Sequence, residues 1–277
     1  MTDRTFPPFS VSMCVYGGDD AAHFKAAVDS ILGGTVVPDE VVLVVDGPVP
    51  EALAEVIAAY EAMPAFCVIR FEENRGHGEA RRAGLAACKH EIVAIMDADD
   101  ISAPDRFALE LAAMEETGAD VVGGMITEFV GEPEHIVGRR TVLCDDAGIK
   151  ADLRGRCPMN LVTVMFRKTA VEAAGGFIDF YCEEDYYLWV RMALGGATFA
   201  NVDADVVNVR VGAEMYRRRG GWRYFKSERA LQKYMRKQGL IGLGTYTVNV
   251  AKRFVVQVLL PNRLRGWVFK KFARKSV

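Results

Sequence analysis

The stretch IVAIMDADDISAPDR, from Ile92 to Arg106, joins a short apolar run to a cluster of acids. The run Ile92–Met96 has the composition of a strand that is buried on both faces. Asp97–Asp100 follows directly and contains three carboxylates, and Pro104 then favours the first turn of a helix. The stretch therefore predicts a buried strand with acids at its carboxyl end and a helix behind it.

Strands and helices are predicted to alternate around this stretch. Mostly apolar runs predict strands at Val11–Val15, Glu40–Val45, Phe66–Phe71 and Ala119–Val122. Helical spacing and turn residues predict helices at Ala21–Leu32, Pro50–Tyr60, Gly78–Cys88 and Pro104–Glu116, the last capped by Ser102 or begun at Pro104. Such alternation is typical of an α/β fold with a mostly parallel sheet and helices on both faces.

Polar residues stand at the ends of three of these strands. Tyr16 ends the first, Asp46 ends the second, and the acids follow Ile92–Met96. Parallel strands bring their carboxyl ends to one edge of a sheet, where ligands bind. We therefore expect Tyr16, Asp46 and Asp97–Asp100 to lie together at that edge.

The pattern is weaker after about Gly131. We expect, in order, a loop or hairpin at Gly131–Leu143, a strand at Thr163–Phe166, helices at Thr169–Ala174 and Glu184–Leu194, one or two strands in Thr198–Val211, and helices at Gly221–Lys237, Leu243–Leu260 and Asn262–Lys275. The expected organisation is an α/β domain over residues 1–212 followed by a helical extension over residues 213–277.

Composition indicates a globular protein of a reducing compartment. Of the 277 residues, 51% are hydrophobic, and no apolar run reaches the roughly 18 residues of a membrane-spanning helix. The N-terminus has no signal-peptide pattern, and the six cysteines are scattered without a CxxC pair. We therefore expect a cytoplasmic protein without a disulfide framework.

The net charge of −3 conceals an uneven distribution. Residues 215–277 carry 17 of the 34 Lys and Arg residues but only one of the 37 acids, Glu228. This basic extension also contains aromatic residues, as in the segment Trp267–Lys275. An anionic membrane surface would bind such a sequence, and we favour that partner over packing on the acidic body alone. We do not expect nucleic acid as a partner.

The acids after the strand Ile92–Met96 have two interpretations. Asp is common in solvated turns, so a purely structural turn is one of them. The other is a site for Mn²⁺ or Mg²⁺, held by one or two carboxylates and by the phosphates of a ligand. The strong strand before the acids favours the second interpretation, because it would aim them into the ligand cleft.

The chain resembles inverting glycosyltransferases of family 2, which have the Rossmann-like GT-A fold, on six blocks that occur in order. The blocks are SVSMCVYGG (Ser10–Gly18), EVVLVVDGP (Glu40–Pro48), ENRGHGEARRAGL (Glu73–Leu85), IMDADDISAPDR (Ile95–Arg106), CPMNLVTVMFRKTAVEAAGGF (Cys157–Phe177) and EEDYYLWVRMALGG (Glu183–Gly196). The resemblance covers residues 10 to about 211. It implies a nucleotide-sugar half over about residues 1–125 and an acceptor half over about residues 126–212.

The resemblance implies roles for the residues that bind the donor. Tyr16 would lie near the nucleotide base, and Asp46 would hydrogen-bond the uracil or its equivalent. Asp97 would contact the ribose or the metal shell, and Asp99 would ligate the metal that bridges the diphosphate. Arg81 matches the arginine that follows the family's glycine-containing loop.

The resemblance also implies a catalytic pair. Asp185 would be the base that takes the proton of the acceptor hydroxyl, with Glu184 orienting it or binding the acceptor. The competing interpretation is that acids favour the first turn of any helix. Two positions depart from the family pattern: Leu161 stands where many relatives have His, and Arg82 where Asn is usual.

Taken together, these features predict a metal-dependent inverting glycosyltransferase. Its donor would be a nucleotide-diphospho-sugar, preferably a UDP-sugar, and its acceptor a glycan or lipid-linked glycan of a surface polysaccharide or lipopolysaccharide. It would act in the cytoplasm, with peripheral contact to the inner face of the plasma membrane. Two alternatives remain open: a degenerate, membrane-associated GT-A protein that binds glycans or acts as a scaffold, and a sugar nucleotidyltransferase. The second would need a basic glycine-rich phosphate loop near the N-terminus, which this chain lacks.

Overall fold

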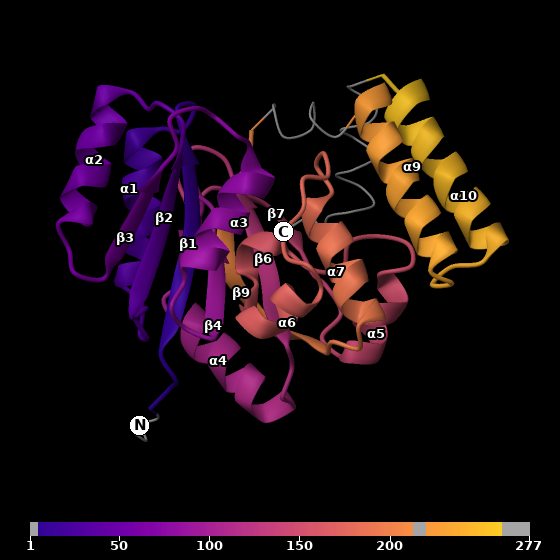
Figure 1. The fold of residues 1–277 in the computed structure, drawn as a ribbon, viewed down its shortest axis with the longest axis horizontal. Coiled ribbons are helices and arrows are strands. Elements are labelled where there is room, and N and C mark those ends of the chain that lie inside the picture. The colour runs from indigo at the N-terminus through magenta and orange to yellow at the C-terminus, as the bar shows by residue number, and fades with distance from the viewer. Residues whose placement is uncertain (1–4, 213–219, 262–277) are drawn as a thin grey trace.

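The computed structural model describes residues 5–212 and 220–261, and in this part of the chain one sheet of nine strands runs through the molecule (Figure 1). The strands are β1 (Phe9–Tyr16), β2 (Glu40–Asp46), β3 (Phe66–Arg70), β4 (Ile92–Met96), β5 (Ile101–Ser102), β6 (Val121–Phe129), β7 (Ile136–Arg140), β8 (Met165–Arg167) and β9 (Phe199–Arg210). Their order in the sheet is β3-β2-β1-β4-β8-β6-β9-β5, and β7 pairs with β6.

The helices of the described residues connect these strands or follow them. They are α1 (Ala21–Leu32), α2 (Glu51–Glu61), α3 (His77–Ala87), α4 (Arg106–Thr117), α5 (Asp146–Asp152), α6 (Lys168–Ala173), α7 (Glu184–Leu194), α9 (Trp222–Lys237) and α10 (Leu243–Phe254), with a 3₁₀ turn at Leu161–Thr163 and a π-helical turn at Val255–Leu259. The predicted helix Asn262–Lys275 lies outside the described residues.

The first four long strands form a parallel sheet, as predicted. β1 pairs in parallel with β2 and β4, and β2 pairs in parallel with β3. The register sets Tyr16 opposite Asp46, so these two residues end neighbouring strands at the same edge. The α/β prediction is confirmed here because every one of these strands is a local apolar run.

The rest of the sheet is mixed. The short strand β8 pairs antiparallel with β4 on one side and with β6 on the other. β7 lies within Gly131–Leu143, where a loop or hairpin was predicted, and forms its hairpin with the preceding β6. β9 is one continuous strand that runs parallel to β6. The strand β5 and the helix α5 were not predicted, and α4 begins at Arg106 rather than at Pro104. Ser102 does not cap α4, because its hydroxyl donates to the carbonyl of Ala103 instead.

Helices cover both faces of the sheet, and each face has its own hydrophobic cluster. The first cluster packs α1, α2 and α4 on the sheet, and the second packs α3, α5, α6 and α7 on it. Gly84 lets α3 approach the sheet closely, because a Cβ at this position would lie 2.6 Å from the Ser12 Oγ atom. The position of α3 matters for the site, since this helix carries Arg81.

The helices α9 and α10 form an antiparallel pair at the end of the molecule opposite α2 (Figure 1). α9 belongs to the second hydrophobic cluster, to which it contributes Leu231 and Met235. The ring of Tyr234 also meets the ring of Tyr187 on α7 edge to face, with centroids 4.9 Å apart. This α9–α10 hairpin is therefore packed on the α/β body. Within residues 5–212 and 220–261, no helix is long and apolar enough to cross a membrane.

Candidate active site

A buried arginine links the two groups of predicted site residues. Arg81 on α3 is only 5% exposed, and its Nη2 atom donates to Asp97 Oδ1 at 3.1 Å. Its Nη1 atom lies 3.5 Å from Glu184 Oε1, at the start of α7. Asp97 and Glu184 are far apart in sequence, yet both contact the guanidinium group of Arg81. Asp97 and Glu184 thus lie within one site.

A further carboxylate, Asp19, lies with the acids of the turn after β4. Asp19 Oδ2 accepts a hydrogen bond of 2.9 Å from the backbone N–H of Tyr16. Burial, together with the charges of Asp99 and Asp97, raises the pKa of Asp19 to about 6, although that hydrogen bond opposes the shift. Burial and the neighbouring charge of Asp97 also raise the pKa of Asp99. Asp19 was not among the predicted site residues, although it stands in the turn that follows β1.

These acids form a negatively charged site that suits a hard divalent cation. Among the residues that the structure describes, no three His, Cys, Asp or Glu side chains form a complete metal-binding group. A cation held by only one or two carboxylates fits this donor set, because ligand phosphates and water complete the shell of Mg²⁺ in such sites. Asp99 and Asp97 are the residues that would hold it.

Asp100 has a structural role in the same turn. It is buried, and its Oδ1 atom accepts a hydrogen bond of 2.8 Å from the backbone N–H of Arg210, at the end of β9. The Arg210 side chain donates in turn to the carbonyl oxygens of Asp99 (3.1 Å) and Gly131 (2.8 Å). The acidic turn is therefore fastened to β9, and much of the donor capacity of Arg210 is used for this purpose.

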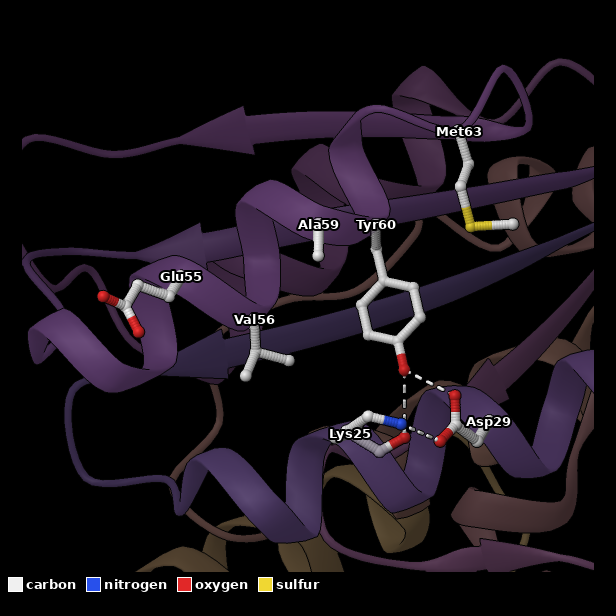
Figure 2. A pocket seen from close by; sticks show the side chains of 7 residues that line it. All are labelled: Lys25, Asp29, Glu55, Val56, Ala59, Tyr60 and Met63. Atoms are coloured by element: carbon white, nitrogen blue, oxygen red, sulfur yellow. Dashed lines mark hydrogen bonds and ion pairs between the residues drawn. The ribbon is translucent and has the colours of Figure 1, made fainter.

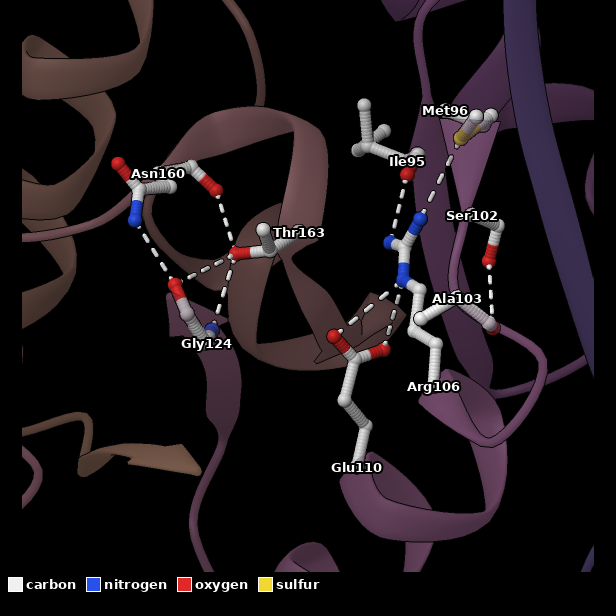
Figure 3. Close-up of polar contacts among 9 residues, drawn as sticks. All are labelled: Ile95, Met96, Ser102, Ala103, Arg106, Glu110, Gly124, Asn160 and Thr163. Carbon is white, nitrogen blue, oxygen red and sulfur yellow. Dashed lines mark hydrogen bonds and ion pairs between the residues drawn. The ribbon is translucent and has the colours of Figure 1, made fainter. Parts of the chain in front are cut away.

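A buried ion pair supports the strand behind the acids (Figure 3). Arg106 and Glu110 on α4 are both fully buried, and the Arg106 Nε atom lies 3.2 Å from Glu110 Oε2. The Nη2 atom of Arg106 also donates to the carbonyl of Ile95 at 2.8 Å. The end of β4, just before Asp97, is thus held by a charged side chain of α4 inside the hydrophobic core. Arg106 ends the stretch Ile92–Arg106, but this supporting role was not predicted from the sequence.

Asp46 holds the loop that leads into α3. Its two carboxylate oxygens accept from the backbone N–H groups of Arg75 (2.6 Å) and Gly76 (2.9 Å). The Tyr16 side chain is 43% exposed and lies against the backbone of Gly18, where a Cβ would meet its hydroxyl group at 2.5 Å. Both residues lie at the predicted edge, with the Tyr16 ring accessible to a ligand.

Asp185 stands in the first turn of α7. Its Oδ2 atom is 3.8 Å from the Cys157 Sγ atom, and its Oδ1 atom accepts from the backbone N–H of Tyr186 at 2.7 Å. Burial and the charge of Asp185 raise the pKa of the neighbouring Glu184, although Arg81 opposes this. Arg82, one of the departures from the family pattern, lies on the outer face of α3 and pairs with Glu79.

The block Cys157–Phe177 is fixed by a second polar cluster (Figure 3). The Nδ2 atom of Asn160 donates to the carbonyl of Gly124 at 2.8 Å, and the Thr163 hydroxyl accepts from the Gly124 N–H at 3.0 Å. Thr163 also donates to the Asn160 carbonyl at 2.7 Å. These bonds tie the 3₁₀ turn that contains Leu161 to β6.

A pocket of about 390 Å³ lies between α1 and α2 (Figure 2). Its lining includes Tyr60, whose hydroxyl donates to Asp29 at 2.6 Å. None of the predicted site residues lines it. The candidate active site is therefore the acid-lined edge around Arg81 and not this pocket.

The fold agrees with the comparisons to known proteins. Residues 10–172 match the family model described as glycosyl transferase family 2, and residues 92–260 match the one described as glycosyl transferase family group 2. The chain belongs to glycosyltransferase family 2, and it is a glycosyltransferase with the GT-A fold. The family resemblance carried by the six sequence blocks is thus confirmed.

Two bacterial glycosyltransferases and one solved structure illustrate the similarity. The UDP-Gal:α-D-GlcNAc-diphosphoundecaprenol β-1,3-galactosyltransferase of Escherichia coli is 32% identical over 99% of this chain and 99% of its own length. The amylovoran biosynthesis glycosyltransferase AmsE of Erwinia amylovora is 35% identical over 79% of this chain and 82% of its own length. A solved mannosyltransferase from Pyrobaculum calidifontis, in complex with GDP-Man and Mn²⁺, superposes with a TM-score of 0.63 at 18% identity, over 99% of this chain and 77% of that one.

Proposed function

We propose that this glycosyltransferase uses a UDP-sugar and Mn²⁺ or Mg²⁺ to add one sugar, with inversion, to a lipid-linked glycan. The observation that carries the proposal is the meeting of Asp97 and Glu184 at Arg81, at 3.1 and 3.5 Å. It joins the acids that suit a metal-bound diphosphate to the acids that suit an acceptor hydroxyl. A donor and an acceptor bound to these two groups would therefore be neighbours.

The donor side follows from the charges at the strand ends. Asp99 and Asp97 would hold the cation, and Tyr16 and Asp46 would lie near the nucleotide base. When bound, the divalent ion supplies electrostatic stabilisation to the charge that develops on the departing diphosphate. We expect UDP rather than GDP as the nucleotide, because the name of the similar E. coli galactosyltransferase specifies UDP-Gal.

The chemical step needs one proton acceptor. The acceptor hydroxyl oxygen forms a bond to the anomeric carbon while the bond from that carbon to the diphosphate oxygen breaks. The hydroxyl proton passes to the Asp185 carboxylate, and the electron pair of the broken bond leaves with the diphosphate. A single displacement inverts the anomeric configuration. Arg81 contacts both Asp97 and Glu184, which adjoins Asp185, and would thereby hold the two groups of acids at a set distance from each other.

The acceptor is proposed to be a sugar carried on a lipid diphosphate at the inner face of the plasma membrane. Several exposed residues of α10 are apolar, including Leu243 (60% exposed) and Val248 (51%), whereas its polar Asn249 is buried against α9. The exposed residues of α9 include Lys226 and Lys233. Apolar side chains beside cations suit the interface of an anionic bilayer.

Calorimetric titration tests the donor side. We expect UDP to bind in the presence of Mn²⁺ and far more weakly in its absence, and GDP to bind more weakly than UDP. The variant Asp99→Ala should lose the metal-dependent part of the affinity, whereas Asp203→Ala, which removes an exposed acid of β9, should retain it. Equal UDP affinity of wild type and Asp99→Ala would refute the metal assignment.

Turnover and membrane contact need two further measurements. NMR of the product of UDP-galactose and a synthetic GlcNAc-α-diphosphate-alkyl acceptor should report a β linkage, since the donor is an α anomer. Sedimentation with vesicles should recover the protein with phosphatidylglycerol and not with phosphatidylcholine. Retention of the α configuration would overturn the single displacement, and equal recovery with both lipids would overturn the charge-dependent contact.

A further inference from the structure

The α9–α10 hairpin contacts the two chain segments that lie on either side of Asp185. One is the segment Leu153–Cys157, which follows α5 and ends beside the Asp185 carboxylate. The other is Tyr181–Glu183, which leads directly into the first turn of α7. Nothing in the sequence pattern of the basic extension predicts these contacts.

Three successive carbonyl groups of the first segment are each bound by a side chain. The Tyr186 hydroxyl donates to Leu153 O at 2.6 Å, and Asn249 Nδ2 donates to Arg154 O at 2.9 Å. Arg253 Nη2 donates to Gly155 O at 2.9 Å. Two of these three donors belong to α10, so α10 fixes the backbone just before Cys157.

The second segment is bound by α9. The Ser227 hydroxyl donates to the Tyr181 carbonyl at 2.8 Å, and the Arg223 guanidinium lies 3.9 Å from the centroid of the Tyr181 ring. Cys182 has a φ of 57°, in the left-handed region, which costs an L-residue free energy and persists only where surrounding contacts impose it. Anchoring on both sides of Cys182 by α9 and α7 supplies such contacts.

A buried charge cluster joins the two helices of the hairpin behind α7. Arg253 on α10 forms an ion pair with Glu228 on α9, and both side chains are largely buried. Glu183 is also buried, and a hydrogen bond with Tyr224 of α9 and the charge of Arg253 favour its ionised form. Burial and the neighbouring Glu228 and Asp185 carboxylates nonetheless raise its pKa well above the usual range.

We propose that the α9–α10 hairpin is a positioning element of the active site, in which Arg253 and Ser227 hold the two segments that set the position of Asp185. This inference rests on the proposed role of Asp185 as the base. The hairpin thereby acts on the transfer step and leaves the nucleotide site, on the far side of Arg81, unaffected. Loss of its contacts should lower kcat for transfer and leave UDP affinity unchanged.

The test compares full-length Arg253→Met and Ser227→Ala with Lys252→Met, using UDP-galactose and the GlcNAc-α-diphosphate-alkyl acceptor. Lys252→Met is a matched control, because it removes a cation from the adjacent, exposed position of the same helix. We expect kcat to fall ~10–100-fold in Arg253→Met, since a small displacement of a reacting group has effects of this size. In Ser227→Ala, kcat should fall by a smaller factor. In Ser227→Thr, which keeps the hydroxyl, kcat should equal the wild-type value.

Hydrogen exchange separates positioning from general destabilisation. Amide exchange should rise at residues 153–157 and 181–185 in Arg253→Met and Ser227→Ala, with strand exchange and the Kd for UDP unchanged. Kinetics and local exchange equal to those of Lys252→Met would overturn the inference. If Arg253→Met does not fold, Ser227→Ala and its Thr counterpart decide the question alone. A wild-type protein that binds no UDP would instead overturn the proposed function.

Discussion

The two sides of the candidate site are built in different ways. On the donor side, Tyr16 and Asp46 end buried strands that pair in parallel, so the sheet and the hydrophobic packing of its strands place them. On the acceptor side, Asp185 stands where a loop enters a helix, and side chains from distant elements bind the backbone around it. The two sides therefore depend on different interactions. We expect donor binding to survive substitutions that abolish sugar transfer.

The largest expected effect separates the two sides by function. Asp185→Asn removes the proposed proton acceptor, so kcat should fall by about 10²–10⁴-fold. The Kd for UDP with Mn²⁺ should stay within about twofold of the wild-type value, as no binding energy on the donor side is lost. Steady-state kinetics and calorimetry on one preparation check both quantities. A parallel loss of turnover and UDP affinity would mean that the two sides are not independent.

The next effect concerns stability and tests the buried ion pair that supports β4 on the donor side. Arg106→Met leaves Glu110 as an unpaired acid in the core and should lower the free energy of unfolding by about 3–5 kcal/mol. The double variant Arg106→Met/Glu110→Met should recover much of this loss. Arg70→Met breaks an exposed pair with Glu61 in the same half and should cost less than about 1 kcal/mol. Urea denaturation measures the free energy of unfolding of all three variants. An Arg106→Met variant as stable as the wild type would contradict the proposed support of β4 by Arg106.

The smallest effect is a pH dependence of the same buried pair. Burial raises the pKa of Glu110 from 4.5 to about 7, although Arg106 opposes the shift. Between these pH values the folded state binds more protons at this site than the unfolded state, so the contribution of Glu110 to stability falls as the pH rises. Relative to Glu110→Gln, the wild type should therefore lose stability between pH 5 and about 7. If the free energies of unfolding of the wild type and of Glu110→Gln change with pH in parallel across this range, the pKa of Glu110 is not raised.

The same contrast explains which parts of the fold could be predicted. The bounds of α1, β4 and α7 agree with the sequence analysis residue for residue, because each is a local hydrophobic pattern. The two-residue strand β5 was missed because only its pairing with β9 defines it. The helix α5 was missed because it is short and weakly apolar, although Asp145, which caps it, was an available signal.

The site was predictable where it lies at strand ends and less so elsewhere. Asp97 was identified from its place at a strand end and Asp185 from the family motifs, but nothing local reveals that Arg81 bridges Asp97 and Glu184. The contacts of Ser227 and Arg253 with backbone carbonyls are also invisible to pattern analysis, since any suitable donor could make them. Whether Tyr16 and Asp46 recognise the base stays a prediction, as does the boundary between the domain and its extension.

The place of β8 in the sheet has a consequence for the synthesis of this protein. β4 is fully buried and has β1 on one side, but its other neighbour is β8, which the ribosome makes only after β6 and β7. Until Met165–Arg167 emerges, the nascent chain carries a completely apolar strand with an open edge, the kind of surface on which chains aggregate. A chain truncated before β8 would keep this edge permanently, so we expect such fragments to require chaperones or to precipitate.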